Sequence, residues 1–247
     1  MFDHITLRVP DLAAASRAFT AVLDELEIEQ TGSTPSFSVW GNFALTQTDE
    51  EHPIARRVEV AFIAPTPAHV DRFARAGVDA GFAGNGPAGL RPDYAEDYYA
   101  AYLTDAAGNC FEAVHRHGER PEGNIDHVAI RVSDLAASTA FYSTIAPAVG
   151  VTLSRQTADR AEFAVGASDG SFSVIAGQPT QNTHIAFSGE DDDVRRFHAD
   201  AIAAGHRSNG EPGERPRYHE GYYAAYVLDP DGNNIEVVNH HRSRAPA

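Results

Sequence analysis

The sequence predicts an α+β fold built from two tandem modules, each composed of two βαβββ units. Two observations lead to this prediction: a long internal repeat and a regular alternation of strand and helix patterns. FDHITLRVPDLAAASRAF at 2–19 matches IDHVAIRVSDLAASTAFY at 125–142, and RPDYAEDYYAAYLTDAAGNCFEAV at 91–114 matches RPRYHEGYYAAYVLDPDGNNIEVV at 215–238. Matched residues lie 123 or 124 positions apart, so the repeat covers nearly the whole chain.

A polar segment between the two copies predicts the module boundary. RHGERPEG at 116–123 contains Gly and Pro among charged residues, which is typical of a linker. We therefore expect an N-terminal module over residues 1–118 and a C-terminal module over residues 124–247. A chain of 247 residues is long enough for two small domains.

The first unit shows the pattern that the other three repeat. Apolar and polar residues alternate in FDHITLRV at 2–9, which predicts a strand with one buried face. Asp11 is a candidate N-cap for a helix over 11–26. Short alternating runs at 36–40 and 43–47 predict two further strands.

The same order of elements is expected along the rest of the chain. The predicted elements are a strand at 56–64, a helix over 66–77 that ends at Gly77, strands at 98–105 and 109–116, a strand at 126–132, a helix from Asp134, strands near 160–176, a strand at 183–188, a helix at 190–204, and strands at 221–228 and 233–240.

Composition and charge exclude several classes of function. The net charge of −16 argues against nucleic acid as a partner, because binding to phosphates needs a basic surface. Cys110 is the single cysteine, so no internal disulfide can form, and a reducing compartment fits. The sequence has neither a long apolar run nor the layout of a signal peptide, so we expect a cytoplasmic protein without a membrane partner.

Polar side chains interrupt otherwise apolar strands at equivalent places in both modules. Taken singly, each of them is more often an ordinary polar residue than a metal ligand. Their joint recurrence favours metal binding, and imidazole with carboxylate suits Fe(II), Mn(II), Zn(II), Ni(II) or Co(II). The candidates are His127, His184 and Glu236 in the C-terminal module, and His4, Glu59 and Glu112 in the N-terminal module.

The chain resembles the vicinal oxygen chelate superfamily, which includes glyoxalase I, fosfomycin-resistance proteins, bleomycin-binding proteins and extradiol dioxygenases. The resemblance rests on DHITLRVPDL, DHVAIRVSDL, THIAF and GYYAAYVLDPDGNNIEVV, and it spans essentially the whole chain as two modules. It implies paired βαβββ units that form a cup-shaped mixed sheet around a divalent metal. It also implies that His127, His184 and Glu236 are the metal residues.

Members of this superfamily can exchange half-modules, which leaves the grouping of the ligands open. In the exchanged arrangement, His4 joins His184 and Glu236. His127 then joins Glu59 and Glu112. A fused pair of modules can also mimic the dimer of single-module relatives, so a monomer and a homodimer are both compatible with the sequence.

The hairpin near the C-terminus is similar to the signature of extradiol dioxygenases. The fitting residues are His219, Tyr226, Asp229, Pro230, Gly232 and Glu236. The chain departs from that signature at Ala225 and Arg217, and the N-terminal copy has Ala95 and Ala106 in place of His219 and Pro230. The resemblance implies a catalytic C-terminal module with Fe(II) or Mn(II) favoured. His219 would act as an acid/base beside the metal, and Tyr226 would donate a hydrogen bond to a bound oxygen.

Three functions are compatible with these patterns, each with a small-molecule ligand. The first is an extradiol-type ring-cleaving dioxygenase acting on a vicinal diol or enediol. The second is a glyoxalase-like lyase or isomerase, in which a metal-bound carboxylate such as Glu59 or Glu112 moves a proton. The third is a non-enzymatic binding protein for a drug or metabolite, which the acidic charge would suit but which needs no metal ligands. The histidines at 115–118 and 239–244 are interpreted as parts of solvated segments.

Overall fold

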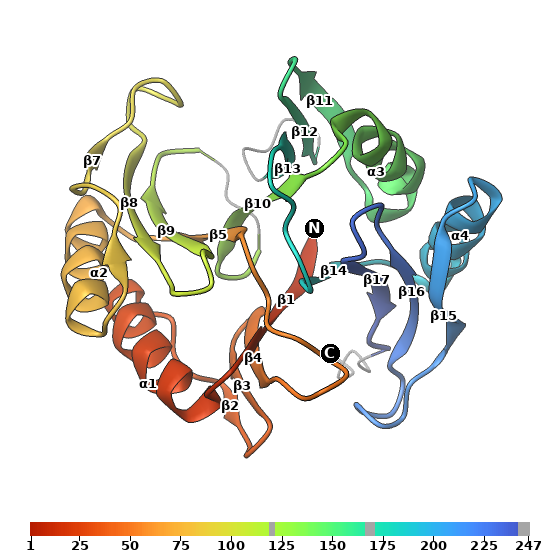
Figure 1. Cartoon of the computed structure of the whole chain (residues 1–247), viewed down its shortest axis with the longest axis horizontal. Coiled ribbons are helices and arrows are strands. Elements are labelled where there is room, and N and C mark those ends of the chain that lie inside the picture. The colour runs from red at the N-terminus through yellow and green to blue at the C-terminus, as the bar shows by residue number, and fades with distance from the viewer. Residues whose placement is uncertain (119–121, 166–170, 242–247) are drawn as a thin grey trace, which may run out of the picture.

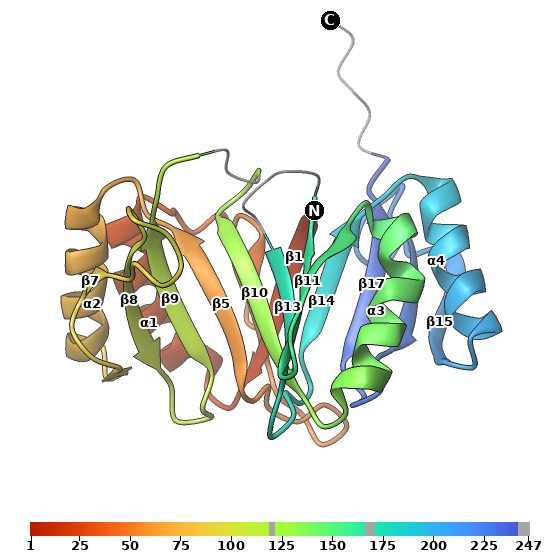
Figure 2. The same ribbon diagram turned by 90° about the horizontal axis from the view of Figure 1, so that it is seen from above.

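Two mixed β-sheets cross the whole width of the protein, and each is built from strands of both halves of the chain (Figure 1). The computed structural model describes residues 1–118, 122–165 and 171–241. Its helices lie at the two outer ends of the molecule, and the two sheets diverge between them (Figure 2). This α+β architecture confirms the predicted fold class.

The first sheet has eight strands and the second has nine. The first contains, in spatial order, β15 (Arg207–Glu214), β16 (Tyr223–Leu228), β17 (Asn234–Asn239), β14 (His184–Ser188), β1 (Phe2–Val9), β4 (Phe43–Gln47), β3 (Phe37–Trp40) and β2 (Gly32–Ser33). The second contains β11 (Thr152–Gln156), β12 (Arg160–Ala164), β13 (Ser171–Ala176), β10 (Ile125–Val132), β5 (Val58–Ile63), β9 (Cys110–His115), β8 (Tyr99–Thr104) and β6 (Ala83–Gly84), with β7 (Gly89–Leu90) also paired to β8.

The helices pack in pairs that follow the order of the chain. They are α1 (Leu12–Leu23), α2 (Pro67–Asp79), α3 (Leu135–Val149) and α4 (Asp191–Ala203), and a 3₁₀ turn at Asp24–Leu26 follows α1. Helix α1 packs against α2, and α3 packs against α4. The side chains of Asp11 and Asp134 accept hydrogen bonds from the backbone N–H groups of Ala14 and Ala137, so both predicted N-caps are confirmed.

The sheets combine the four units in an order that differs from their order along the chain. Strand β1 pairs antiparallel with β14, which places Thr6 opposite His184. Strand β10 pairs antiparallel with β5, which places Ala129 opposite Glu59. The first unit therefore shares a sheet with the fourth, and the second shares one with the third. This is the exchanged arrangement that the sequence left open.

The modules at 1–118 and 124–247 remain a prediction about how the chain divides. Elements of the first half lie on the left of Figure 1 and elements of the second half on the right, yet both sheets join the two. Residues 119–121 of the expected linker and residues 242–247 lie outside the described residues. Arg116, which the linker was expected to include, is buried against Asp126.

Alternation along the central strands separates the core from two concave faces. On β1, Ile5 and Leu7 point into the main hydrophobic core and are fully buried, while His4 and Thr6 face the other side. The concave face of the first sheet carries small side chains such as Ala186 among its polar residues. Small residues at these positions leave room for larger side chains from neighbouring strands to converge.

Several elements differ from the sequence-based expectation. Strands β2, β6, β7 and β11 were not predicted, and two further differences have a clear physical reason. Helix α2 continues to Asp79 rather than ending at Gly77, because Gly77 is a packing residue: a Cβ atom there would overlap the side chain of Leu103. Strand β15 was not predicted, because its sequence RSNGEPGE is polar and rich in Gly and Pro. An edge strand that pairs only with β16 tolerates such residues. No helix in the described residues is long and apolar enough to cross a membrane.

The contact at Gly77 generates a stability prediction with an internal control. The equivalent pair in the second half of the chain is Ala201 and Val227. Its helix residue is larger than Gly77 and its strand residue is smaller than Leu103. Gly77→Ala should destabilise the protein by about 1–3 kcal/mol through overpacking. Gly77→Ala combined with Leu103→Val should recover most of that loss. Denaturant unfolding measures the stability of both variants. A Gly77→Ala variant as stable as the wild type would contradict the packing role of Gly77.

Candidate metal centres

Three neighbouring strands of the first sheet bring His4, His184 and Glu236 together on its concave face. In the register, His4 on β1 lies opposite Ala186 on β14, and Ala186 lies opposite Glu236 on β17. His184 lies two residues from Ala186 along β14, so its side chain points to the same face of the sheet. We call these three residues the first centre.

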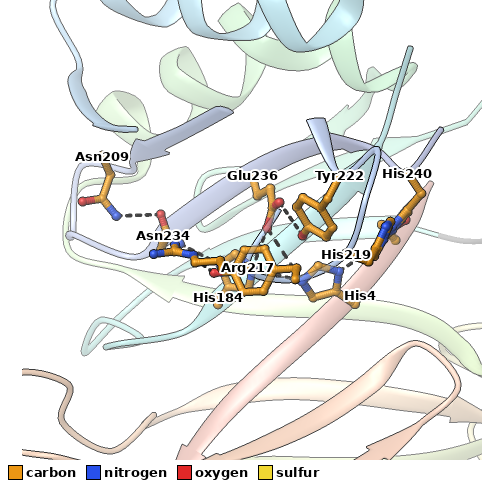
Figure 3. Close-up of polar contacts among 11 residues, drawn as sticks. His4, His184, Asn209, Arg217, His219, Tyr222, Asn234, Glu236 and His240 are labelled. Carbon is orange, nitrogen blue, oxygen red and sulfur yellow. Dashed lines mark hydrogen bonds and ion pairs between the residues drawn. The ribbon is translucent and has the colours of Figure 1, made fainter. Parts of the chain in front are cut away.

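The ligand atoms of the first centre converge on one point (Figure 3). The Nε2 atom of His184 lies 2.8 Å from Oε2 of Glu236, and Nε2 of His4 lies 3.1 Å from Nε2 of His184 and 3.7 Å from the same carboxylate oxygen. A metal ion bonded at about 2.1 Å to two ligands at right angles holds them about 3.0 Å apart. The donor set and its spacing therefore fit a divalent metal ion.

Each member of the first centre is oriented by a neighbouring polar group. Nδ1 of His4 donates to Asp3 at 2.7 Å, and this bond leaves the Nε2 lone pair facing the centre. The Nδ1 atom of His184 is 2.8 Å from the side-chain amide of Asn234. The hydroxyl of Tyr222 donates to Oε1 of Glu236 at 2.6 Å. One carboxylate oxygen of Glu236 is thus held by Tyr222 while the other faces the two histidines.

The charges at the first centre favour an ionised carboxylate. Burial raises the pKa of Glu236, but the hydrogen bond from His184 and the charges of His184 and His4 outweigh it and lower the pKa. Burial lowers the pKa of His4, but the hydrogen bond to Asp3 and the charge of Glu236 raise it overall. Burial and the charge of Glu236 raise the pKa of Tyr222, so its hydroxyl stays a donor.

A second centre lies at the equivalent place on the other sheet, from β5, β9 and β10. Nε2 of His127 is 3.2 Å from Oε2 of Glu112 and 3.7 Å from Oε1 of Glu59. The hydroxyl of Tyr98 donates to Glu112 at 2.8 Å, and Nδ1 of His127 donates to Asp126 at 2.9 Å. Its ligand atoms also converge to within 4.8 Å of one another. With one nitrogen and two carboxylate donors, it is richer in oxygen than the first.

The structure corrects the grouping of ligands that the superfamily resemblance implied. His127 does not join His184 and Glu236; its place is taken by His4. The reason is the backbone pairing, because β1 is the hydrogen-bonded neighbour of β14 and β10 is the neighbour of β5. All six candidate residues fall into the two exchanged sets.

Tyr226, one of the two expected catalytic residues, lies in the cavity of the first centre. This cavity has a volume of about 830 Å³ and also contains His4, His184 and Glu236. Among the described residues, the buried hydroxyls of Tyr226 and Thr183 have no partner within hydrogen-bond distance, although both residues line this cavity. Two buried hydroxyls without partners beside three converging ligands indicate a place for a polar ligand.

His219, the other expected catalytic residue, does not line this cavity. Its Nδ1 donates to the backbone carbonyl of Glu220 at 2.7 Å, and its Nε2 is 2.8 Å from Nδ1 of His240. Both ring nitrogens are therefore occupied. The geometry gives His219 an indirect connection to the first centre, and it does not support direct contact with a substrate.

Sequence reasoning missed four residues that support the first centre: Asp3, Tyr222, Asn234 and His240. His240 was assigned to a solvated segment, but it contacts Asp3 through a ring nitrogen 3.0 Å from both carboxylate oxygens. Comparison of the repeats could have found two of them. Asp3 and Asp126 precede the ligand histidines, and Tyr222 and its equivalent Tyr98 lie at the same offset from the ligand glutamates.

Comparison with known proteins agrees with the fold. Residues 124–237 match the family model for the Glyoxalase/Bleomycin resistance protein/Dioxygenase superfamily. The C-terminal part of the chain therefore shows the sequence pattern of this superfamily. No curated protein matches the whole sequence significantly.

Solved structures of the superfamily share the arrangement of the whole chain. The structure of glyoxalase I from Zea mays is similar over 97% of this chain and 92% of its own, with a TM-score of 0.68 and 19% identity. A proposed dioxygenase from Bacillus subtilis is similar over 96% of this chain and 84% of its own, with a TM-score of 0.65 and 15% identity. At such identities the likeness establishes the fold.

Double histidine variants test the exchanged grouping. If both centres bind metal, His4→Ala with His184→Ala should lose one equivalent, because both residues belong to the first centre. His127→Ala with His184→Ala should lose both equivalents. Elemental mass spectrometry after loading with Zn(II) measures metal per chain. Loss of both equivalents from His4→Ala with His184→Ala, and of one from His127→Ala with His184→Ala, would contradict the exchanged grouping. If the wild type binds a single equivalent, His4→Ala should lose it and His127→Ala should keep it.

Proposed function

We propose that the protein is a divalent-metal-dependent enzyme that acts on a vicinal diol or enediol, in the manner of an extradiol dioxygenase. The observation that carries this proposal is the first centre itself. Two histidines and one glutamate converge from one side, and the unpartnered hydroxyl of Tyr226 lies in the same cavity. This donor set with open positions is the one that non-haem Fe(II) oxygenases use.

Three ligands on one face leave the opposite side open for a small molecule. His4, His184 and Glu236 all come from the floor of the concave sheet, so a ligand approaches from the cavity above. A bound divalent ion, with Fe(II) or Mn(II) favoured, would act as a Lewis acid that lowers the pKa of a chelated hydroxyl. The cavity volume lies within the range of about 300–1,000 Å³ that is typical of small-molecule sites.

Tyr226 is suited to donate a hydrogen bond to the substrate. Burial and the charge of Glu236 raise its pKa, so the hydroxyl keeps its proton at neutral pH. The guanidinium of Arg215 packs over its ring and adds positive charge nearby. Because no acceptor among the described residues lies within hydrogen-bond distance of this hydroxyl, an oxygen of a bound ligand is a suitable acceptor.

The second centre favours a second candidate function, a glyoxalase-like lyase or isomerase. Glu59 is 30% exposed, whereas Glu112 is almost fully buried. An accessible carboxylate at a metal centre can carry a proton between two carbon atoms of an enediol-forming substrate. A binding protein without catalytic function is less well supported, because pure binding needs neither set of converging ligands.

Oxygen uptake separates these functions. Protein purified without chelator and loaded anaerobically with Fe(II) or Mn(II) is mixed with catechol, and an oxygen electrode and the absorbance of a ring-cleaved product are recorded. Consumption of one O₂ per catechol cleaved would support the dioxygenase. Exchange of the carbon-bound hydrogen of an α-hydroxy ketone with D₂O, without oxygen uptake, would favour the lyase or isomerase. Neither activity, with no metal bound, would overturn both.

The role of Tyr226 yields a kinetic prediction with a matched control. Tyr226→Phe removes a hydrogen-bond donor and should lower kcat by about 10²-fold with little effect on metal content. Tyr102→Phe makes the same change at the equivalent position on the other sheet and should leave an activity of the first centre unaltered. Steady-state kinetics on the active substrate measures both. Equal losses in the two variants would contradict the assignment of Tyr226 to the active cavity.

A further inference from the structure

A cavity of about 590 Å³ beside the second centre is lined by more guanidinium groups than carboxylates. Its charged lining residues are Arg57, Arg91, Arg131, Glu59 and Asp93, of which Glu59 belongs to the second centre. The chain as a whole has 35 Asp and Glu residues against 19 Lys and Arg residues, so a surplus of positive charge in one cavity runs against its composition. We call this space the arginine cavity.

Two of these arginines lie next to one another at the same end of two paired strands. Strands β10 and β5 pair with Ile130 opposite Val58, so the adjoining residues Arg131 and Arg57 occupy neighbouring places at that end. Both side chains line the arginine cavity. Like charges at neighbouring places on paired strands repel each other, and a bound anion would relieve this repulsion.

Neither of the two neighbouring guanidinium groups has an anionic partner in the protein. Nε of Arg57 donates to the backbone carbonyl of Pro179 at 2.8 Å. Among the residues that the structure describes, no carboxylate oxygen lies within ion-pair distance of the guanidinium of Arg57 or of Arg131. A guanidinium has five N–H donors, so most of the donors of this pair are left for a ligand or for water.

The backbone at Arg57 has an unusual conformation for an arginine. Its φ angle is +58°, in the left-handed region that Asn adopts several times more often than most other residues. Asn182 lies two residues before His184, as Arg57 lies two before Glu59, and its φ angle is also +58°. The repeat thus has a residue suited to this conformation in one half and an arginine in the other. The unfavourable choice favours a role for the arginine side chain.

The same place on the first sheet presents a different charge. Arg8 is the equivalent of Arg131, and it lines the cavity of the first centre together with Asn182. The carboxylates of Asp49 and Glu51 line that cavity as well. One guanidinium beside an amide therefore replaces the pair of guanidiniums, and we expect the two cavities to accept different ligands.

We propose that the arginine cavity binds a small molecule carrying a phosphate or carboxylate group, and that Arg57 and Arg131 bind this group. Guanidinium groups hold either oxyanion through two parallel N–H donors, a geometry that an amide cannot reproduce with the same charge. The cavity volume lies in the range of small-molecule sites, so it accommodates more than the oxyanion alone.

Calorimetric titration of metal-free protein tests this site with simple probes. The protein is treated with chelator and dialysed, so that neither probe can bind through a metal ion. Inorganic phosphate and succinate are titrated separately, and the tighter probe tells whether the cavity is suited to a phosphate or to a carboxylate. We expect the wild type to bind one equivalent of at least one probe. Binding of neither probe would overturn the proposal.

Substitutions based on the repeat locate the bound probe. Arg57→Asn copies Asn182 and suits the left-handed backbone, and it should weaken binding by about tenfold or more, as expected for the loss of a charged hydrogen bond. Arg131→Gln removes the second guanidinium at an exposed side chain and should have a similar effect. Arg8→Gln makes the matched change in the cavity of the first centre and should leave the affinity within about twofold of the wild type.

The outcomes separate the site from its alternatives and from the proposed function. Denaturant unfolding first establishes that each variant is folded. Unchanged affinity in Arg57→Asn and Arg131→Gln would place the probe elsewhere and overturn the proposal. An equal loss in Arg8→Gln would overturn the difference between the two cavities. Because the titration uses metal-free protein, its result stands whether or not the first centre proves to be a metal-dependent enzyme.

Discussion

The antiparallel pairing of β1 with β14 is the constraint on which the first centre depends. It places His4 beside Ala186, and the parallel pairing of β14 with β17 then places Glu236 in the same row. A shift of one residue in either register would turn one ligand into the hydrophobic core. The matching pair of β10 and β5 does the same for the second centre, so both centres exist only because strands from different halves of the chain share a sheet.

Buried polar groups at the two centres are held by the same kinds of partner, with one difference. Each glutamate receives a tyrosine hydroxyl, and each ligand histidine donates to an aspartate. The difference is the group opposite the aspartate, which is Arg116 in the second centre and His240 in the first. A guanidinium is a fixed cation with five N–H donors, whereas an imidazole offers two ring nitrogens. The repeat thus places a basic residue opposite the aspartate in both centres while changing its chemical group.

Local sequence patterns were sufficient for most elements but could not reveal long-range partners. The alternation in 2–9 predicted β1, and Asp11 predicted the start of α1, because both signals arise within a few residues of chain. Gly77 was misjudged as a helix end, because its role is to make room for Leu103 on a distant strand. His240 was misjudged as part of a solvated segment, because its partners Asp3 and His219 lie far away in sequence.

The sequence by itself determined the four βαβββ units, the six candidate ligands and the face of each strand that carries them. These features follow from side-chain period and type, which are local properties of the chain. The tertiary structure decided which ligands meet. It placed Tyr226 in the cavity of the first centre and His219 outside that cavity, in contact with His240. Those outcomes depend on which strands hydrogen-bond to one another, and two equivalent pairings were open to a repeated sequence until the backbone register selected one.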